Sequence, residues 1–191
     1  PQTDAVQAMV EESFRSNAGI VSPKIVRWDD PQALVHVGMS IDKSAALIDR
    51  VRPGEVDHGQ HDSVRDVFVA PSGCMLVRAD LFEELRGFDP VISAMAEDLD
   101  LCWRAQVAGA RVVVAPSAHA RHLEAVPGGI EPEDPGDSPT PYALQRRHEL
   151  RALLKCYSLF HLVRVLPQAA LLSLAELLVA SVARDRARAR A

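Results

Sequence analysis

The segment from Glu97 to His122, EDLDLCWRAQVAGARVVVAPSAHARH, decides the fold of this chain. Three carboxylates open it, where negative charge complements the positive end of a helix dipole. Gly109 ends the predicted helix, and the apolar run at residues 111–115 predicts a short strand before the closing histidine. This order of elements can bring a catalytic carboxylate and a metal-binding imidazole to one pocket.

The three carboxylates, Glu97, Asp98 and Asp100, allow two interpretations. As residues of a first helical turn they need no function beyond stabilising the helix. Clustered like charges also raise the pKa of one carboxylate, which makes it a better general base near neutral pH. The residues alone leave both interpretations open.

Histidines occur in two groups. His119 and His122 are three residues apart, so on a strand they point to opposite faces, and we do not expect them to bind one ion together. One of them could instead join carboxylates from elsewhere around a divalent cation. His58 and His61 match no known metal-site spacing and are interpreted as part of a solvated loop. A metal-binding regulatory domain that uses all four histidines is a separate hypothesis.

The rest of the chain predicts alternating short helices and strands, which is typical of a layered α/β domain. Apolar spacing from Ala5 predicts a helix that Asn17 stops. Residues 19–27 predict a strand that Pro23 confines to an edge or divides in two. Residues 28–66 predict a long excursion from the core. Further strands are expected at 34–37, 67–70 and 74–77, and helices at 79–85 and 142–157.

Composition restricts the classes of protein. The 191 residues are 48% hydrophobic, enough for one core with an appendage. The net charge of -5 combines an acidic body with a basic end, because Lys and Arg outnumber Asp and Glu by 9 to 3 from Gln145 onward. The basic residues have no interleaved aromatics, so no nucleic-acid partner is expected. The three cysteines form no CxxC pair, which argues against a zinc knuckle or a disulfide framework.

The end of the chain predicts a lid and a membrane-associating segment. Residues 127–141 hold five prolines, which is typical of a loop or lid. Residues 165–183 are almost continuously apolar and carry one charge, Glu176. Nineteen residues are near the lower limit for spanning a bilayer, and an interfacial helix followed by a basic tail is the alternative. We expect residues 165–191 to contact a membrane surface.

The order of three stretches resembles the second half of family 2 inverting glycosyltransferases with the GT-A fold. The stretches are SGCMLVRADLFEELRGFDP, AEDLDLCWRAQVAGARVVVAPSAHARH and RRHELRALLKCYSL, and they fall between residues 67 and 159. Family members show a small-residue turn, a Gly-Phe-Asp turn, a Glu-Asp-x-Asp-Leu helix with Trp-Arg, and a later Pro followed by His. The matching residues here are Gly73, Arg78, Phe82, Gly87, Phe88, Asp89, Glu97, Asp98, Leu99, Asp100, Leu101, Trp103, Arg104, Gly109, Pro116 and His122.

The resemblance implies a role for each matched residue. Asp98 would be the base that deprotonates the acceptor hydroxyl, and Glu97 would shape that catalytic site. Gly73, Cys74 and Asp100 would be acceptor-binding. The family's donor diphosphate is held by a divalent cation, Mn²⁺ or Mg²⁺, which His122 would approach as the metal-site residue. Arg104 is expected to anchor the helix, outside the substrate site.

The resemblance also implies a division of the chain and its surroundings. The fold class expected is α/β, an incomplete GT-A domain: a Rossmann-like, mixed sheet with flanking helices, followed by C-terminal apolar helices. Residues 1–126 would be the acceptor-side half, 127–141 the lid, and 142–191 the helical, membrane-associating segment. The family's nucleotide-binding half is not in this sequence, so we expect the isolated chain to bind the nucleotide-sugar donor poorly and to transfer little. The role of Arg147-His148, where the family often has Arg-Asn, is in doubt.

The expected activity is sugar transfer to a glycan or lipid-linked acceptor in cell-envelope synthesis, at the cytoplasmic face of the cell membrane. A second hypothesis belongs to another class: a non-catalytic, membrane-docking module that keeps the glycosyltransferase fold. The apolar stretch at residues 165–183 and the basic tail motivate it.

Overall fold

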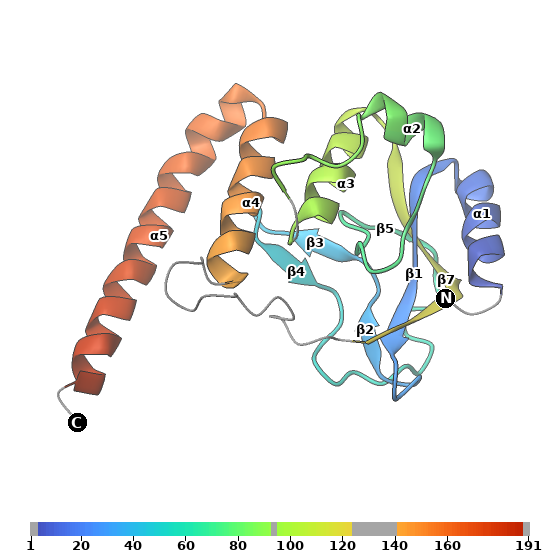
Figure 1. Ribbon diagram of the computed structural model, residues 1–191, viewed down its shortest axis with the longest axis horizontal. Coiled ribbons are helices and arrows are strands. Elements are labelled where there is room, and N and C mark those ends of the chain that lie inside the picture. Colours follow the sequence, from blue (N-terminus) through green and yellow to red (C-terminus); the bar gives the residue numbers. More distant parts are fainter. Residues whose placement is uncertain (1–3, 93–94, 124–140, 189–191) are drawn as a thin grey trace.

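The computed structural model describes residues 4–92, 95–123 and 141–188 and shows an α/β fold (Figure 1). A mixed sheet forms its centre, and helices flank it, as the sequence predicts. The helices are α1 (Ala5–Ser16), α2 (Ala79–Glu84), α3 (Glu97–Val107), α4 (Pro141–Cys156) and α5 (Leu159–Arg188). The strands are β1 (Ala18–Arg27), β2 (Leu34–His36), β3 (Met39–Ile41), β4 (Leu47–Asp49), β5 (Arg65–Asp66), β6 (Leu76–Val77) and β7 (Arg111–His122).

The sheet has the order β2-β1-β7-β5, and β6 pairs with the part of β1 that β2 leaves free. Strands β1 and β7 are parallel, and the other pairs in this sheet are antiparallel. Alternate residues of β1 enter different layers: Val21 packs with α1, and Ile20 packs in the larger cluster with Leu99 of α3. The two long parallel strands therefore lie between α1 and α3.

The expectation that Pro23 confines its strand to an edge, or divides it, is wrong. Strand β1 is continuous over ten residues and is central, with neighbours on both sides. Pro23 pairs with Ala115 and the next residue, Lys24, with His119, so β7 bulges outward at this point. A proline is tolerated in a sheet at a bulge because the hydrogen-bond ladder is already interrupted there.

Lys24 connects the long excursion to the sheet through two ion pairs. Its side chain is 1% exposed, and its Nζ lies 2.7 Å from Oδ2 of Asp57 and 2.6 Å from Oδ1 of Asp62. The short strand expected near residues 34–37 is present as β2, whereas the hairpin of β3 and β4 was not expected. A buried ammonium group needs charged partners, and here the excursion supplies both of them.

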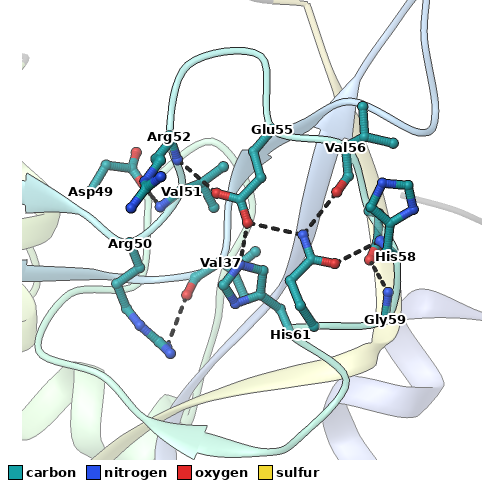
Figure 2. A network of polar contacts seen from close by, with 12 residues as sticks. Val37, Asp49, Arg50, Val51, Arg52, Glu55, Val56, His58, Gly59 and His61 are labelled. Atoms are coloured by element: carbon teal, nitrogen blue, oxygen red, sulfur yellow. Dashed lines mark hydrogen bonds and ion pairs between the residues drawn. The ribbon is translucent and has the colours of Figure 1, made fainter.

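Glu55 organises the loop that contains His58 and His61 (Figure 2). Its carboxylate accepts hydrogen bonds from the backbone N–H of Arg52 and from the side chains of Gln60 and His61, each at 2.9 Å. The N–H of Arg52, followed by the two side chains, lowers the pKa of Glu55 to about 2. Within residues 4–92, 95–123 and 141–188, no three His, Cys, Asp or Glu side chains are placed to hold a metal ion together. The hypothesis of a four-histidine regulatory metal site gains no support from these residues.

Helix α4 packs on α3, and α5 leaves the body of the domain along a separate direction (Figure 1). Near the start of α5, Val165 is buried in the main core, while Leu159, Phe160 and Val163 are each at least 70% exposed. None of the helices over the described residues is long and apolar enough to cross a membrane. The expected lid lies, apart from Pro141, outside the described residues.

Candidate functional site

The first residues of α3 follow a backbone turn in an unusual conformation. Met95 and Ala96 both have positive φ, 60° and 71°, a region that non-glycine residues seldom occupy. Nδ1 of His148 on α4 lies 2.9 Å from the carbonyl oxygen of Met95 and supports the turn. Residues held in such conformations cluster at functional sites, since the surrounding structure must maintain them. The turn presents Glu97 and Asp98 at the beginning of the helix.

The turn between β5 and β6 meets this helix terminus. The backbone N–H of Ser72 donates to Oδ2 of Asp98 at 3.1 Å, and its hydroxyl donates to Oε1 of Glu97 at 2.6 Å. The N–H of Leu99 donates to Oδ1 of Asp98 at 2.8 Å. Each carboxylate oxygen of Asp98 therefore accepts a backbone hydrogen bond, which fixes the orientation of the group.

The small turn also contacts His122, the final residue of β7. A Cβ atom built on Gly73 would lie 2.9 Å from both Cδ2 and Nε2 of His122, closer than side chains normally approach. A side chain at position 73 would therefore force the imidazole to shift. The resemblance implies that Gly73 binds the acceptor, and in the structure the group near it is an imidazole. Gly73, His122, Glu97 and Asp98 are thus brought to one place by three separate segments.

Two polar atoms at this place are buried without a hydrogen-bond partner among the described residues: Oε2 of Glu97 and Nδ1 of His122. Such atoms are uncommon in folded proteins and call for an explanation. An imidazole nitrogen with no protein partner can serve as a metal ligand, so His122 fits the divalent cation that the resemblance implies. Glu97 could accept a hydrogen bond from a substrate hydroxyl.

The pKa of Asp98 is raised to about 6, because burial disfavours the charged form and the neighbouring Glu97 adds repulsion. The side chain is 8% exposed. The hydrogen bonds from Ser72 and Leu99 act in the opposite direction. Charge clustering, the cause considered from sequence, is therefore present but second to burial. A carboxylate with this pKa is ionised at neutral pH and is basic enough to accept a proton.

The same shift predicts how folding stability depends on pH. The folded-state pKa of Asp98, about 6, lies above the ordinary value of 3.8, so the unfolded chain ionises first. Its contribution to stability is complete below pH 4 and is lost as the pH rises to 6. Asp98→Asn removes this titration but also loses one backbone hydrogen bond, because an amide has one acceptor oxygen. We therefore expect the free energy of unfolding of the variant, relative to the parent, to be about 2–3 kcal/mol higher at pH 7.5 than at pH 4. Urea denaturation at both values tests this, and an equal effect at both would contradict it.

Asp100 lies apart from this site. It is 0% exposed, and its carboxylate pairs with Arg104 at 2.7 Å and with Lys155 of α4. Arg104 also donates to the carbonyl oxygens of Leu85 and Gly87 at 2.8 and 2.9 Å. The anchoring role expected of Arg104 is confirmed by these contacts. With no atom facing solvent, Asp100 is placed to join α3 to α4, and this location does not favour the expected acceptor-binding role.

Cys74 follows Gly73 and is half-buried. Burial raises the pKa of its thiol, so the group stays protonated and behaves as a small apolar side chain. It packs against two hydrophobic clusters, one of them with Val35 and Ala120. Its contribution to an acceptor site stays a prediction.

Two residues that sequence reasoning did not assign to the site belong to it. Ser72 contacts both Glu97 and Asp98, and a small polar residue in the turn before Gly73 was the available signal. His148 supports the turn before α3, and the sequence left its role in doubt. Neither pairing follows from local spacing, because Ser72 and His148 are distant in the chain from their partners.

The site thus combines a buried, oriented carboxylate with an imidazole nitrogen that has no partner among the described residues, on a mixed sheet with flanking helices. The model of the family described as glycosyltransferase-like family 2 matches residues 1–140. The chain belongs to this family and is a glycosyltransferase-family domain. No individually curated protein matches it.

Proposed function

We propose that this chain is the acceptor-side part of an inverting, metal-dependent glycosyltransferase in which Asp98 is the catalytic base. The observation that carries the proposal is the Asp98 carboxylate, which is buried, held by two backbone N–H groups and has a pKa of about 6. The family membership supplies the reaction type, transfer of a glycosyl group.

The chemistry is a single displacement. Asp98 accepts the proton of the acceptor hydroxyl while the hydroxyl oxygen forms a bond to the anomeric carbon of a nucleotide sugar. The bond from that carbon to the diphosphate oxygen breaks, and the nucleotide diphosphate leaves with the electron pair. Attack from the face opposite the leaving group inverts the anomeric configuration. Glu97, with one oxygen held by Ser72 and the other without a partner, is placed to bind an acceptor hydroxyl.

A divalent cation, Mn²⁺ or Mg²⁺, would offset the negative charge that grows on the departing diphosphate. His122 is the described residue suited to hold it, since its Nδ1 is buried and without a partner. Further ligands would come from the donor and from the nucleotide-binding half.

The surroundings of the reaction form part of the proposal. Helix α5 exposes the apolar side chains of Leu171, Leu174 and Val179, and arginines follow in the sequence. Such a helix suits contact with a membrane surface, and we place the reaction at the cytoplasmic face of a cell membrane, in cell-envelope glycan synthesis. The same helix favours the alternative function, a non-catalytic membrane-docking module.

Donor binding and product stereochemistry test the proposal together. Calorimetry would titrate UDP-, GDP- and dTDP-sugars with Mn²⁺ into this chain and into a version extended N-terminally by a nucleotide-binding half, about 100 residues. We expect binding and transfer with the extended version, and NMR should show a product of inverted anomeric configuration. Retention would refute the single displacement. Absence of donor binding in both versions would favour the docking module.

A further inference from the structure

A groove runs along one face of α4, with a volume of about 670 Å³. Four cationic side chains line it, those of Arg146, Arg147, Arg151 and Lys155, and His148 adds an imidazole. Among the described residues that line it there is no carboxylate, although the chain as a whole has a net charge of -5. We refer to these five residues with their apolar neighbours as the α4 groove.

A buried acid forms ion pairs with two of these cations. Asp89, with a side chain 7% exposed, lies 2.8 Å from Nε of Arg151 and 2.9 Å from Nζ of Lys155, and these two contacts hold its pKa well below the ordinary value. The side chains of Arg151 and Lys155 are 42% and 32% exposed. The carboxylate is thus buried while its two cationic partners face the solvent. Because the ion pairs already hold Arg151 and Lys155 in place, binding a ligand would cost these side chains little further conformational entropy.

Arg147 differs from the others. It is exposed and has no hydrogen-bond or ion-pair partner within the described part of the chain. An unpaired guanidinium beside cations that ion pairs already hold in place forms a site for an anion. The planar guanidinium of arginine matches the oxygens of a phosphate group.

The groove adjoins the turn that precedes α3. His148 lines the groove, and its Nδ1 lies 2.9 Å from the carbonyl oxygen of Met95, two residues before Glu97. A ligand in the groove would therefore lie on the acceptor side of α3. The groove also has apolar walls, formed by Val91, Leu150 and Leu154, the last of which is 54% exposed.

We propose that the α4 groove binds the phosphate group of a phosphorylated lipid, which on the proposed function is the acceptor. The cations provide the phosphate site, and the apolar walls suit the first part of a hydrocarbon chain. The apolar walls support a lipid over a water-soluble phosphate, because inorganic phosphate would leave Val91, Leu150 and Leu154 without an apolar partner. Cationic and apolar side chains in one groove match an amphipathic ligand.

The test is calorimetry on the whole chain with three soluble probes: dihexanoyl phosphatidic acid, inorganic phosphate, and dihexanoyl phosphatidylcholine, which is zwitterionic. We expect phosphatidic acid to bind at least about tenfold more tightly than either of the others, because it alone combines net negative charge with acyl chains. Equal affinity for inorganic phosphate and phosphatidic acid would reduce the groove to a free-phosphate site and overturn the lipid assignment.

Arg147→Gln should weaken phosphatidic acid binding by about tenfold, the loss of one charge-assisted hydrogen-bonding group. Because Arg147 has no structural partner here, the variant should keep the thermal unfolding midpoint of the parent chain. Arg52→Gln is the matched control, an exposed arginine in the excursion between β4 and β5, and should bind as the parent does. Equal affinities of the two variants would overturn the site.

The outcome can be separated from that of the proposed function. Asp98→Asn should leave phosphatidic acid binding unchanged, because Asp98 does not line the groove. If the extended protein binds the lipid but transfers no sugar, the proposed enzymatic function is refuted and the proposed lipid site stands. If it transfers sugar to acceptors that lack phosphate and binds no lipid, the proposed lipid site is refuted and the enzymatic function stands.

Discussion

Asp98→Asn is expected to reduce the rate of sugar transfer by about 10² to 10⁴-fold, the range typical of general-base catalysis. The amide has nearly the shape of the carboxyl group, but its single oxygen can accept only one of the N–H groups of Ser72 and Leu99, which donate to different oxygens of Asp98. The variant therefore loses one backbone hydrogen bond together with the group that accepts the proton. The rate is measured with the N-terminally extended protein at saturating donor and acceptor.

Two controls accompany this variant. The donor affinity should stay within about twofold of the parent value, a change of less than about 0.5 kcal/mol, since the proposed role of Asp98 is toward the acceptor. Glu83→Gln, which neutralises an exposed acid on α2, should transfer at the parent rate. Parent-like turnover by Asp98→Asn would remove Asp98 from the mechanism. In the parent, the rate should fall as the pH drops below about 6, where the Asp98 carboxylate is protonated.

Asp100→Asn is expected to lower the free energy of unfolding by about 3 kcal/mol, the lower end of the cost of breaking a buried ion pair. The carboxylate is fully buried and joins Arg104 of α3 to Lys155 of α4. The cost stays at the lower end because both cations keep other acceptors, Asp89 for Lys155 and two carbonyl oxygens for Arg104.

Urea denaturation followed by tryptophan fluorescence measures this effect. Trp103 is 6% exposed and packs edge-on against Phe68 and Tyr157, so its emission should report opening of the α3 layer. An unchanged unfolding free energy for Asp100→Asn, together with a raised acceptor KM, would restore the acceptor-binding role.

The sequence predicted the helix that begins at Glu97 and the start of the strand at Arg111 close to where they are observed, because helical spacing and a terminating glycine are local signals. It underestimated β7, which continues through Pro116 to His122. It also misjudged β1, since a proline's effect on a strand depends on whether the partner strand bulges beside it. The hairpin of β3 and β4 carries weak periodicity and was missed.

The sequence by itself determined the family, the α/β class and the choice of Glu97 and Asp98 as candidate site residues, because these depend on residue types in a fixed order. The tertiary structure alone decided which carboxylate is held by backbone N–H groups and which is paired with cations. Asp98 and Asp100 are two residues apart on one helix, yet Asp98 meets the backbone of Ser72 and Asp100 meets Lys155. Burial and partner charge control a carboxylate's chemistry, and both are set by residues distant in the chain.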